Sequence, residues 1–289
     1  ICQEIKMYDD DPDWRVYFGA IANLYHNHPV RIDIAGTCDT VNNTYKDMLE
    51  LCYHTFYHPH NMMLFVVGNI QPEELVDVIK ENQNKKHFLP ETSIQKKKIE
   101  EPESVAVKEQ IDIMQVEMNK LIVSIKVNDI LTNPQEKIKR ELSFNLLFDL
   151  YFSKSSVLYN EWLSKGYINE TFSANFTQER DYAFILIGGD QDDYHILQKT
   201  IFDFIEHIDD LVIEQEDFER IKRKTIGNFI NSYNSPESIA NSFSRYYFEG
   251  ICSFELVDYV SKITIADLNE VKKYFNKEYA STYIVKKDK

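Results

Sequence analysis

The first 84 residues carry apolar positions at the three- and four-residue spacing of helices. One apolar stripe starts at the first residue with no capping residue before it, so we expect the chain to begin inside a helix. Asp11 and Pro12 suit the cap and first turn of the next helix. The apolar run from Met62 to Val67 predicts a buried strand. The helices expected in this region cover residues 1–8, 11–26, 44–57 and 72–84.

From residue 105 onward, short alternating segments take turns with longer helical ones. The expected strands are 105–115, 121–127, 168–176, 182–187 and 283–285. The expected helices are 134–152, 155–165, 193–207, 215–233, 236–249 and 264–275. Residues 85–104 contain lysine runs, two prolines and few apolar residues, which is typical of a linker. The sequence therefore predicts a first unit of residues 1–84, a linker of 85–104 and a second unit of 105–289.

A candidate internal repeat relates the two units. Two helix-and-strand segments, which open at Thr44 and Thr264 and so lie 220 residues apart, both begin with the Thr-x-x-Asp spacing of a capping box. A helix followed by a strand is a common unit, so this match alone does not establish a duplication. A true repeat would place the start of the first unit roughly 150 residues before Ile1. We therefore expect an incomplete first unit with exposed apolar surface, unless a second copy or the 105–289 unit covers it.

Composition and charge restrict the function classes. The chain has 289 residues, 43% of them hydrophobic, which is enough for the core of one or two domains. Its formal charge of −15 argues against a nucleic-acid partner, because phosphate binding needs clustered Lys and Arg. No apolar run approaches the roughly 18 residues of a membrane helix and no signal segment is visible, so we expect no membrane partner and a cytoplasmic location, although a missing N-terminus would leave the compartment open. The four cysteines have no CxxC spacing and are expected to be free thiols, with Cys38 and Cys52 in the core.

Several stretches of the sequence form a recognisable set. They read CQEIKMY at 2–8, WRVYFG at 14–19, NLYHNHPVRIDIAGT at 23–37, YHPHNMMLFVVG at 57–68 and NSPESIAN at 234–241. The set resembles the insulinase/pitrilysin family of zinc peptidases, and within it an uncharacterised Firmicutes zinc-protease branch. The resemblance covers essentially the whole chain. It implies an α+β fold of two related units, each with helices packed on an antiparallel sheet, of which the first is incomplete.

The resemblance also implies a zinc centre in the full-length parent. Family members bind Zn²⁺ through two histidines of an inverted H-x-x-E-H helix, whose glutamate is the general base, and through a later glutamate. The later glutamate corresponds to Glu4, which helical spacing places on one face with Ile5 and Tyr8, where a carboxylate needs a partner. Without the resemblance, a surface or salt-bridged role is the commoner one for such a residue. The chain contains neither H-x-x-E-H nor H-E-x-x-H, so we expect it to bind no zinc and to be inactive alone.

Other candidate ligands favour a structural interpretation. The pairs His26-x-His28 and His58-x-His60 have a spacing that suits a metal in an extended segment. Both pairs lie at expected helix ends beside a proline, where a histidine interacts favourably with the helix dipole. Gly188-Gly189 is expected in a turn rather than in a phosphate loop, because the rest of the P-loop pattern is absent.

The second unit departs from the family pattern. Many members carry an Arg and a Tyr there that hold the substrate over the zinc, whereas residues 158–168 contain no Arg and Tyr167 is not clearly in register. The resemblance therefore implies that a second half-molecule, either another copy or a related subunit, completes the site. Two functions remain: a zinc endopeptidase whose parent cleaves peptides or small unfolded proteins in a clamshell chamber, or a non-catalytic half that serves as substrate-binding or heterodimer subunit. An unrelated α+β binding domain is a third, less favoured alternative.

Overall fold

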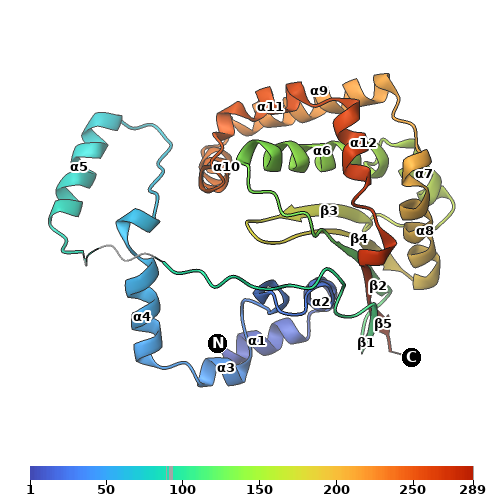
Figure 1. Ribbon diagram of the computed structural model, residues 1–289, viewed down its shortest axis with the longest axis horizontal. Coiled ribbons are helices and arrows are strands. Elements are labelled where there is room, and N and C mark those ends of the chain that lie inside the picture. Colours follow the sequence, from blue (N-terminus) through green and yellow to red (C-terminus); the bar gives the residue numbers. More distant parts are fainter. Residues whose placement is uncertain (89, 91–93, 289) are drawn as a thin grey trace.

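The computed structural model describes residues 1–88, 90 and 94–288. At its centre is a five-stranded sheet with the order β1-β5-β2-β4-β3 (Figure 1). The strands are β1 (Glu109–Met114), β2 (Asn119–Lys126), β3 (Ser173–Gln178), β4 (Ala183–Gln191) and β5 (Ala280–Lys287). Neighbouring strands run antiparallel except β1 and β5, which are parallel. The expected α+β class is confirmed, but the sheet is mixed rather than wholly antiparallel.

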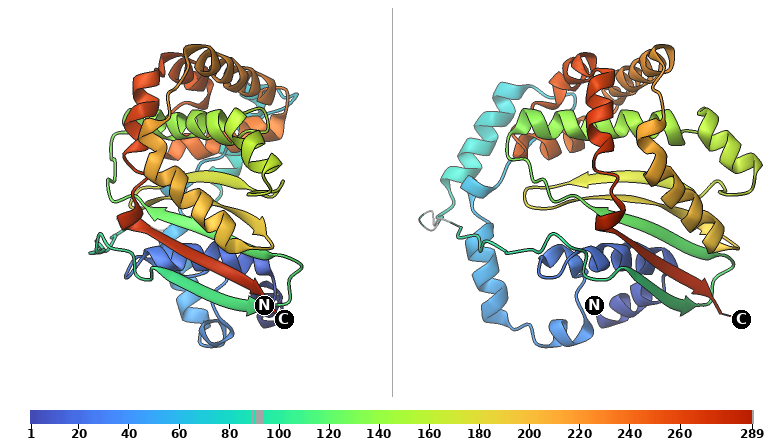
Figure 2. Two further views of the ribbon diagram at one scale, coloured as in Figure 1. Left: turned by 90° about the vertical axis from the view of Figure 1, so that its right-hand side faces the viewer. Right: turned by 45° about the vertical axis from the view of Figure 1, so that its right-hand side comes forward.

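Helices from the second half of the chain cover one face of this sheet (Figure 2). They are α6 (Pro134–Phe152), α7 (Val157–Ser164), α8 (Tyr194–His207), α9 (Gln215–Ser232), α10 (Pro236–Phe248), α11 (Leu256–Lys262) and α12 (Ile265–Lys272). In the core beneath α6, Phe144 is fully buried and stacks on Phe176 with ring centroids 4.0 Å apart. The elements predicted for residues 105–289 are confirmed to within a few residues, and α11 is an additional helix that the sequence pattern did not reveal.

The opposite face of the sheet is covered by α2 (Pro12–Leu24), which follows α1 (Cys2–Asp9). The side chain of Asp11 caps α2 as predicted, by accepting the N–H groups of Asp13 and Trp14. A Cβ at Gly19 would lie 2.2 Å from the ring of Tyr283 on β5, so only glycine allows this close approach. Part of the first unit therefore docks on the sheet of the second, which is one of the arrangements expected for it. The boundary at residue 84 stays a prediction.

Residues 38–88 project away from the sheet, as α4 and α5 show in Figure 1. The helices of this arm are α3 (Cys38–Asn42), α4 (Lys46–Phe56) and α5 (Pro72–Asn84). Neither α4 nor α5 has a buried residue. Large apolar side chains of the arm that are more than half exposed are Tyr45, Leu49, Leu51, Tyr53, Tyr57, Met62, Leu64 and Val78. The expectation of exposed apolar surface is therefore confirmed for this arm, to which the sequence pattern had not assigned α3.

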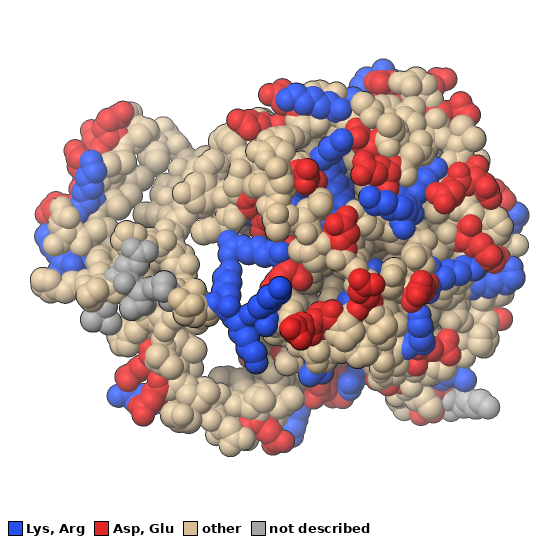
Figure 3. Space-filling model, in the orientation of Figure 1, with Lys and Arg blue, Asp and Glu red and all other residues tan. Residues whose placement is uncertain are grey.

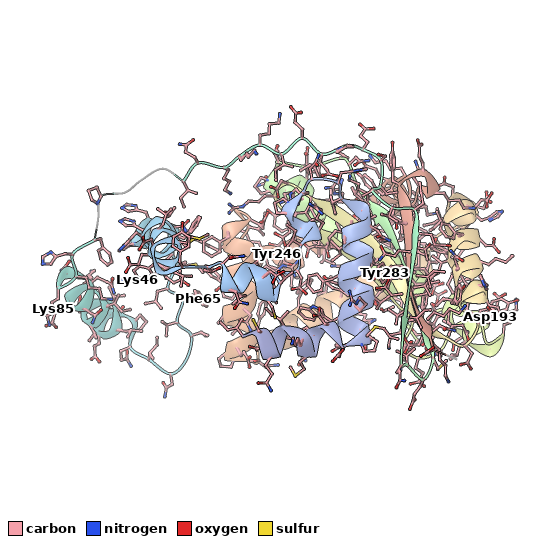
Figure 4. All side chains as sticks on the ribbon, turned by 90° about the horizontal axis from the view of Figure 1, so that it is seen from below. Lys46, Phe65, Lys85, Asp193, Tyr246 and Tyr283 are labelled. Atoms are coloured by element: carbon pink, nitrogen blue, oxygen red, sulfur yellow. The ribbon has the colours of Figure 1, made fainter. Side chains whose placement is uncertain are left out.

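The buried strand predicted from Met62 to Val67 is wrong for this structure. The segment is extended and its exposure alternates along the chain, but it belongs to no strand. A strand requires a neighbour that accepts its backbone hydrogen bonds, and no described strand lies beside this segment. Its main contact is a side chain: Phe65 stacks on Phe243 of α10 with centroids 4.2 Å apart, and Figure 4 shows Phe65 pointing toward the helix that carries Tyr246.

The two predicted capping boxes have different outcomes. The one at Thr264 forms: its side chain and that of Asp267 each bond the other residue's backbone N–H. The one at Thr44 does not form, because α4 begins after Tyr45 without a side-chain cap and the Thr44 hydroxyl donates to the Thr40 carbonyl. The 220-residue correspondence therefore does not extend to the capping or to the strand. In the described part of the chain, no helix has both the length and the apolarity to span a membrane.

Candidate functional site

A groove of about 650 Å³ lies beside α2, over β3 and β4. Its wall is formed by α2, and its floor by side chains that point to the α2 face of the sheet. Residues on the floor and wall include Val16, Tyr17, Ile122, Ser173, Asn175, Thr177 and Leu186. The floor is apolar under α2 and becomes polar toward β3, where hydroxyl and amide groups face outward. Such a surface suits a peptide, which offers backbone polar groups and apolar side chains in alternation.

Lys120 connects the two sides of the groove. Its Nζ lies 2.8 Å from an oxygen of Asp13 on α2 and 3.2 Å from one of Asp190 on β4. Burial would lower the pKa of Lys120, but the two carboxylates raise it above its ordinary value. The ammonium is therefore charged at neutral pH, and it fastens the start of α2 to the end of the sheet. Acidic and basic side chains are similarly interspersed over the face shown in Figure 3.

The outer edge of the groove is the edge strand β3, which has no further strand beside it in the described part of the chain. The Glu179 N–H donates to the Tyr182 carbonyl at the turn between β3 and β4. Because alternate residues of an antiparallel strand direct their backbone groups to opposite sides, Ala174, Phe176 and Gln178 direct theirs away from β4. These outward groups are available to pair with an added strand.

Gly188 and Gly189 lie inside β4, so their predicted position in a turn is wrong. A Cβ at Gly188 would lie 2.0 Å from the carbonyl oxygen of Leu121, and one at Gly189 would lie 2.9 Å from the Cα of Phe172. The glycines permit close packing of neighbouring backbone. A Gly-Gly pair after an apolar run resembles a strand end in sequence, and the partners that require it lie tens of residues away.

Glu4 lies in the first turn of α1 and is exposed. Ile5 is buried and Tyr8 is half-buried, so the apolar face of α1 turns Glu4 to its margin rather than enclosing it. The premise that this carboxylate needs a partner because of burial is therefore wrong. A catalytic zinc needs three protein ligands, and across the described ranges no group of three His, Cys, Asp or Glu side chains could hold a metal. A zinc centre does not fit these residues alone.

The histidine pairs act in capping and packing. His28 is buried, its Nδ1 accepts the N–H of Val30 at 3.1 Å, and its Nε2 lies 3.5 Å from a carboxylate oxygen of Asp181. His58 accepts the N–H of His60 at 3.3 Å, and the two rings stack. The residues follow the helices and cap short 3₁₀ turns, η1 (Pro29–Arg31) and η2 (Pro59–Asn61), instead of lying in the last helical turn as predicted.

A buried ion pair anchors the end of the linker. Glu101 accepts the backbone N–H groups of His26, Asn27 and His28 at 2.7–2.8 Å, and Lys126 of β2 donates to it at 2.7 Å. Burial alone would raise the pKa of Glu101, but the Lys126 ammonium and the three N–H groups lower it to about 2. This Glu101 clasp joins the chain after α2 to the sheet. Sequence analysis missed it, because a glutamate in a charged linker gives no sign of a partner 25 residues later.

The segment that corresponds to the family's substrate clamp forms α7 and the turn after it. Gly166 has a φ of 68° and ends the helix, and Tyr167 is about one-third exposed with the Lys165 ammonium 5.7 Å from its ring centroid. The four cysteines are free thiols. The prediction that Cys38 and Cys52 lie in the core is wrong: Cys52 is exposed and Cys38 half-buried, because the helices that carry them are not covered.

Comparison with known proteins agrees with this architecture. Residues 44–225 match the protein family described as the peptidase M16 inactive domain. The uncharacterized zinc protease YmfH of Bacillus subtilis is 44% identical over 271 residues, which cover 94% of this chain and 63% of the relative. The zinc protease PqqE of Helicobacter pylori is 24% identical over 290 residues, which cover 96% and 62%.

Solved structures show the same fold. A putative M16-like peptidase from Alicyclobacillus acidocaldarius is similar with a TM-score of 0.93 at 29% identity, over 99% of this chain and 69% of that one. A protease from Helicobacter pylori has a TM-score of 0.82 at 21% identity, over 99% and 70%. The helix-covered sheet is thus the architecture of an M16-type peptidase domain. The chain belongs to the peptidase M16 family, the insulinase-type zinc peptidases that its sequence resembles, and spans less than two thirds of the length of the first two relatives.

Proposed function

We propose that this chain is the non-catalytic, substrate-binding half of a zinc-dependent peptidase and does not hydrolyse peptides alone. The groove beside α2 carries this proposal, because it places a half-apolar surface next to the open edge of β3. An extended peptide that pairs with Ala174 and Phe176 would extend the sheet and lay alternate side chains into the groove. The matched family description, which calls the domain inactive, supports a binding role rather than a catalytic one.

The chemistry of the whole protein would come from residues outside the described ones. The relatives are named zinc proteases, and we propose Glu4 as the carboxylate that this chain contributes to a zinc site whose histidines lie elsewhere. Its exposure supports this, since an exposed carboxylate can reach a ligand on another segment. When bound, zinc would polarise the scissile carbonyl and supply a hydroxide. The residues described here bind and orient the peptide.

The same proposal includes a second half-molecule, which is either a copy of this chain or a related subunit. Uncovered apolar side chains on the arm of residues 38–88 support an additional partner surface. We propose a cytoplasmic location, which the four free thiols support, since disulfides persist in oxidising compartments. The less favoured alternative, a subunit that assembles with a partner without contacting substrate, differs in one respect: its groove would stay empty.

Peptide binding tests this proposal. A fluorescently labelled, unstructured peptide of about ten residues is titrated with the chain, and anisotropy reports binding to the edge of β3. Ala174→Pro removes one outward N–H but no hydrogen bond to β4, and edge strands tolerate proline; we expect affinity to fall about tenfold or more. Ala174→Val keeps the N–H and is the matched control. Equal binding by the wild type and the proline variant would contradict the proposed site, and zinc-dependent cleavage by the purified chain would contradict the claim of inactivity.

A further inference from the structure

Two thiols from distant parts of the sequence meet where α1 and α3 pack together near the N-terminus (Figure 1). Cys2 is the first residue of α1 and Cys38 the first residue of α3. The Sγ of Cys38 lies 3.6 Å from the carbonyl oxygen of Cys2, and the Sγ of Cys2 lies 4.0 Å from that of Cys38. Each side chain thus crosses the other residue's backbone. A hydrogen bond with Cys2 raises the pKa of the Cys38 thiol.

This reciprocal placement differs from that of the other two cysteines. Cys52 is exposed on α4, and Cys252 is half-buried just before the 3₁₀ turn η4 (Ser253–Glu255). Neither of them has a sulfur neighbour among the described residues. Cys2 and Cys38 are both half-buried, so small reagents reach them while the helices hold them together. A disulfide requires two cysteines whose backbones are close enough for their side chains to span, and the mutual contacts with backbone carbonyls meet that condition.

We propose that Cys2 and Cys38 form a reversible disulfide with a low-molecular-weight disulfide as oxidant. One thiolate attacks a sulfur of the oxidant, which forms a mixed disulfide and releases one small thiol. The second thiolate then attacks the cysteine sulfur of the mixed disulfide, which forms the Cys2–Cys38 bond and releases the second small thiol. The cysteines lose two protons and two electrons in total, and the oxidant is reduced to two thiols. Excess small thiol reverses both steps.

The bond would change the mechanics of the N-terminal region. It closes a loop from residue 2 to residue 38 that contains α2, the helix docked on the sheet. A cross-link of this length stabilises the folded state by restricting the unfolded chain. It also fastens α3, from which the arm of residues 38–88 departs, to α1. Oxidation would therefore hold the start of the arm in one position relative to the sheet, and reduction would release it.

Peptide mapping tests the bond directly. The chain is equilibrated with oxidised glutathione, its remaining thiols are blocked with iodoacetamide, and it is digested with trypsin. We expect the peptide of residues 1–6 to be linked to that of residues 32–46, and the linkage to disappear on reduction. Cys2→Ser and Cys38→Ser should each abolish it, whereas Cys52→Ser and Cys252→Ser should leave it unchanged. Recovery of both peptides as carbamidomethyl or separate glutathione adducts would overturn the proposal, as would equal cross-linking to Cys52 or Cys252.

Thermal unfolding provides a second readout that does not depend on peptide recovery. The oxidised wild-type chain should melt about 5 °C above the reduced chain, as expected for a cross-link that closes a loop of this size. Oxidant should not raise the melting temperature of Cys38→Ser, which retains Cys2, Cys52 and Cys252. An equal rise in that variant would show that the stabilisation comes from other thiols and would overturn the assignment.

Discussion

The arm of residues 38–88 and the unit of residues 105–288 contain similar helices but differ in what covers them. Every strand in the unit has a neighbour, and its aromatic residues form a closed core. The helices α4 and α5 bury no residue, and the extended segment between them pairs with no strand. The whole chain exposes 17960 Å², whereas a compact monomer of this mass exposes about 13,000 Å². Local pattern thus specifies an element, but burial requires a complementary surface.

Truncation of one phenylalanine in each region gives the largest expected contrast. Phe144 is fully buried against Phe176, so Phe144→Ala should lower the free energy of unfolding by about 3–5 kcal/mol. Phe65 stacks on Phe243 at the surface of α10 and lies on a segment without strand partners, so Phe65→Ala should cost less than about 1 kcal/mol. Urea denaturation followed by circular dichroism measures both.

The two variants test whether the arm belongs to the cooperative unit. A cost for Phe65→Ala similar to that of Phe144→Ala would show that the arm folds together with the sheet. A change in the slope of the urea transition for Phe65→Ala alone would instead indicate that the arm already unfolds separately in the wild type.

The difference between these regions also explains how much the sequence could predict. In the second unit, α6 begins and ends where the pattern of residues 134–152 placed it, because its caps and apolar face are local signals. At residues 62–67 the same kind of signal predicted a strand that the structure lacks, because strand formation depends on a neighbour. Gly188 and Gly189 show the reverse case, in which a local turn signal was overridden by tertiary packing.

The candidate site was less predictable than the fold. Glu4 was assigned from a family resemblance, and its exposed position neither tests nor excludes a ligand role. The groove residues Lys120 and Asp190 and the clasp residue Glu101 carry no motif, because their function comes from partners that folding brings together. The alternating Ser173, Asn175 and Thr177 were the available signal, since polar residues at every second position indicate one polar face of a strand.

The Glu101 clasp tests where the arm ends and the well-packed unit begins. The pKa of Glu101 falls from an ordinary 4.5 to about 2 in the folded state, so its contribution is fully present above pH 4.5 and is lost as pH falls toward 2. Glu101→Gln should lower the free energy of unfolding by about 2 kcal/mol at pH 7 and by progressively less below pH 4. Denaturation in urea at pH 7, 5 and 3 measures this dependence.

Glu100→Gln is the matched control, because the neighbouring Glu100 is exposed and its backbone carbonyl, rather than its carboxylate, bonds Asn27. We expect it to change stability by less than about 0.5 kcal/mol at every pH. Equal effects of the two substitutions would show that general charge, rather than the bonds to Lys126 and the three N–H groups, accounts for the stabilisation.

The smallest expected effect compares two helical glycines and isolates the docking of α2. Gly19→Ala places a Cβ 2.2 Å from the Tyr283 ring, which is buried and bonded through its hydroxyl to Asp112, so the ring cannot move freely. The clash should outweigh the better helix propensity of alanine and cost about 1–2 kcal/mol. Gly227→Ala on α9 meets no atom within 4 Å, so the same substitution should stabilise by up to about 1 kcal/mol. Thermal unfolding of both variants measures opposite shifts from one chemical change, and stabilisation by Gly19→Ala would mean that α2 does not rest on β5 as described.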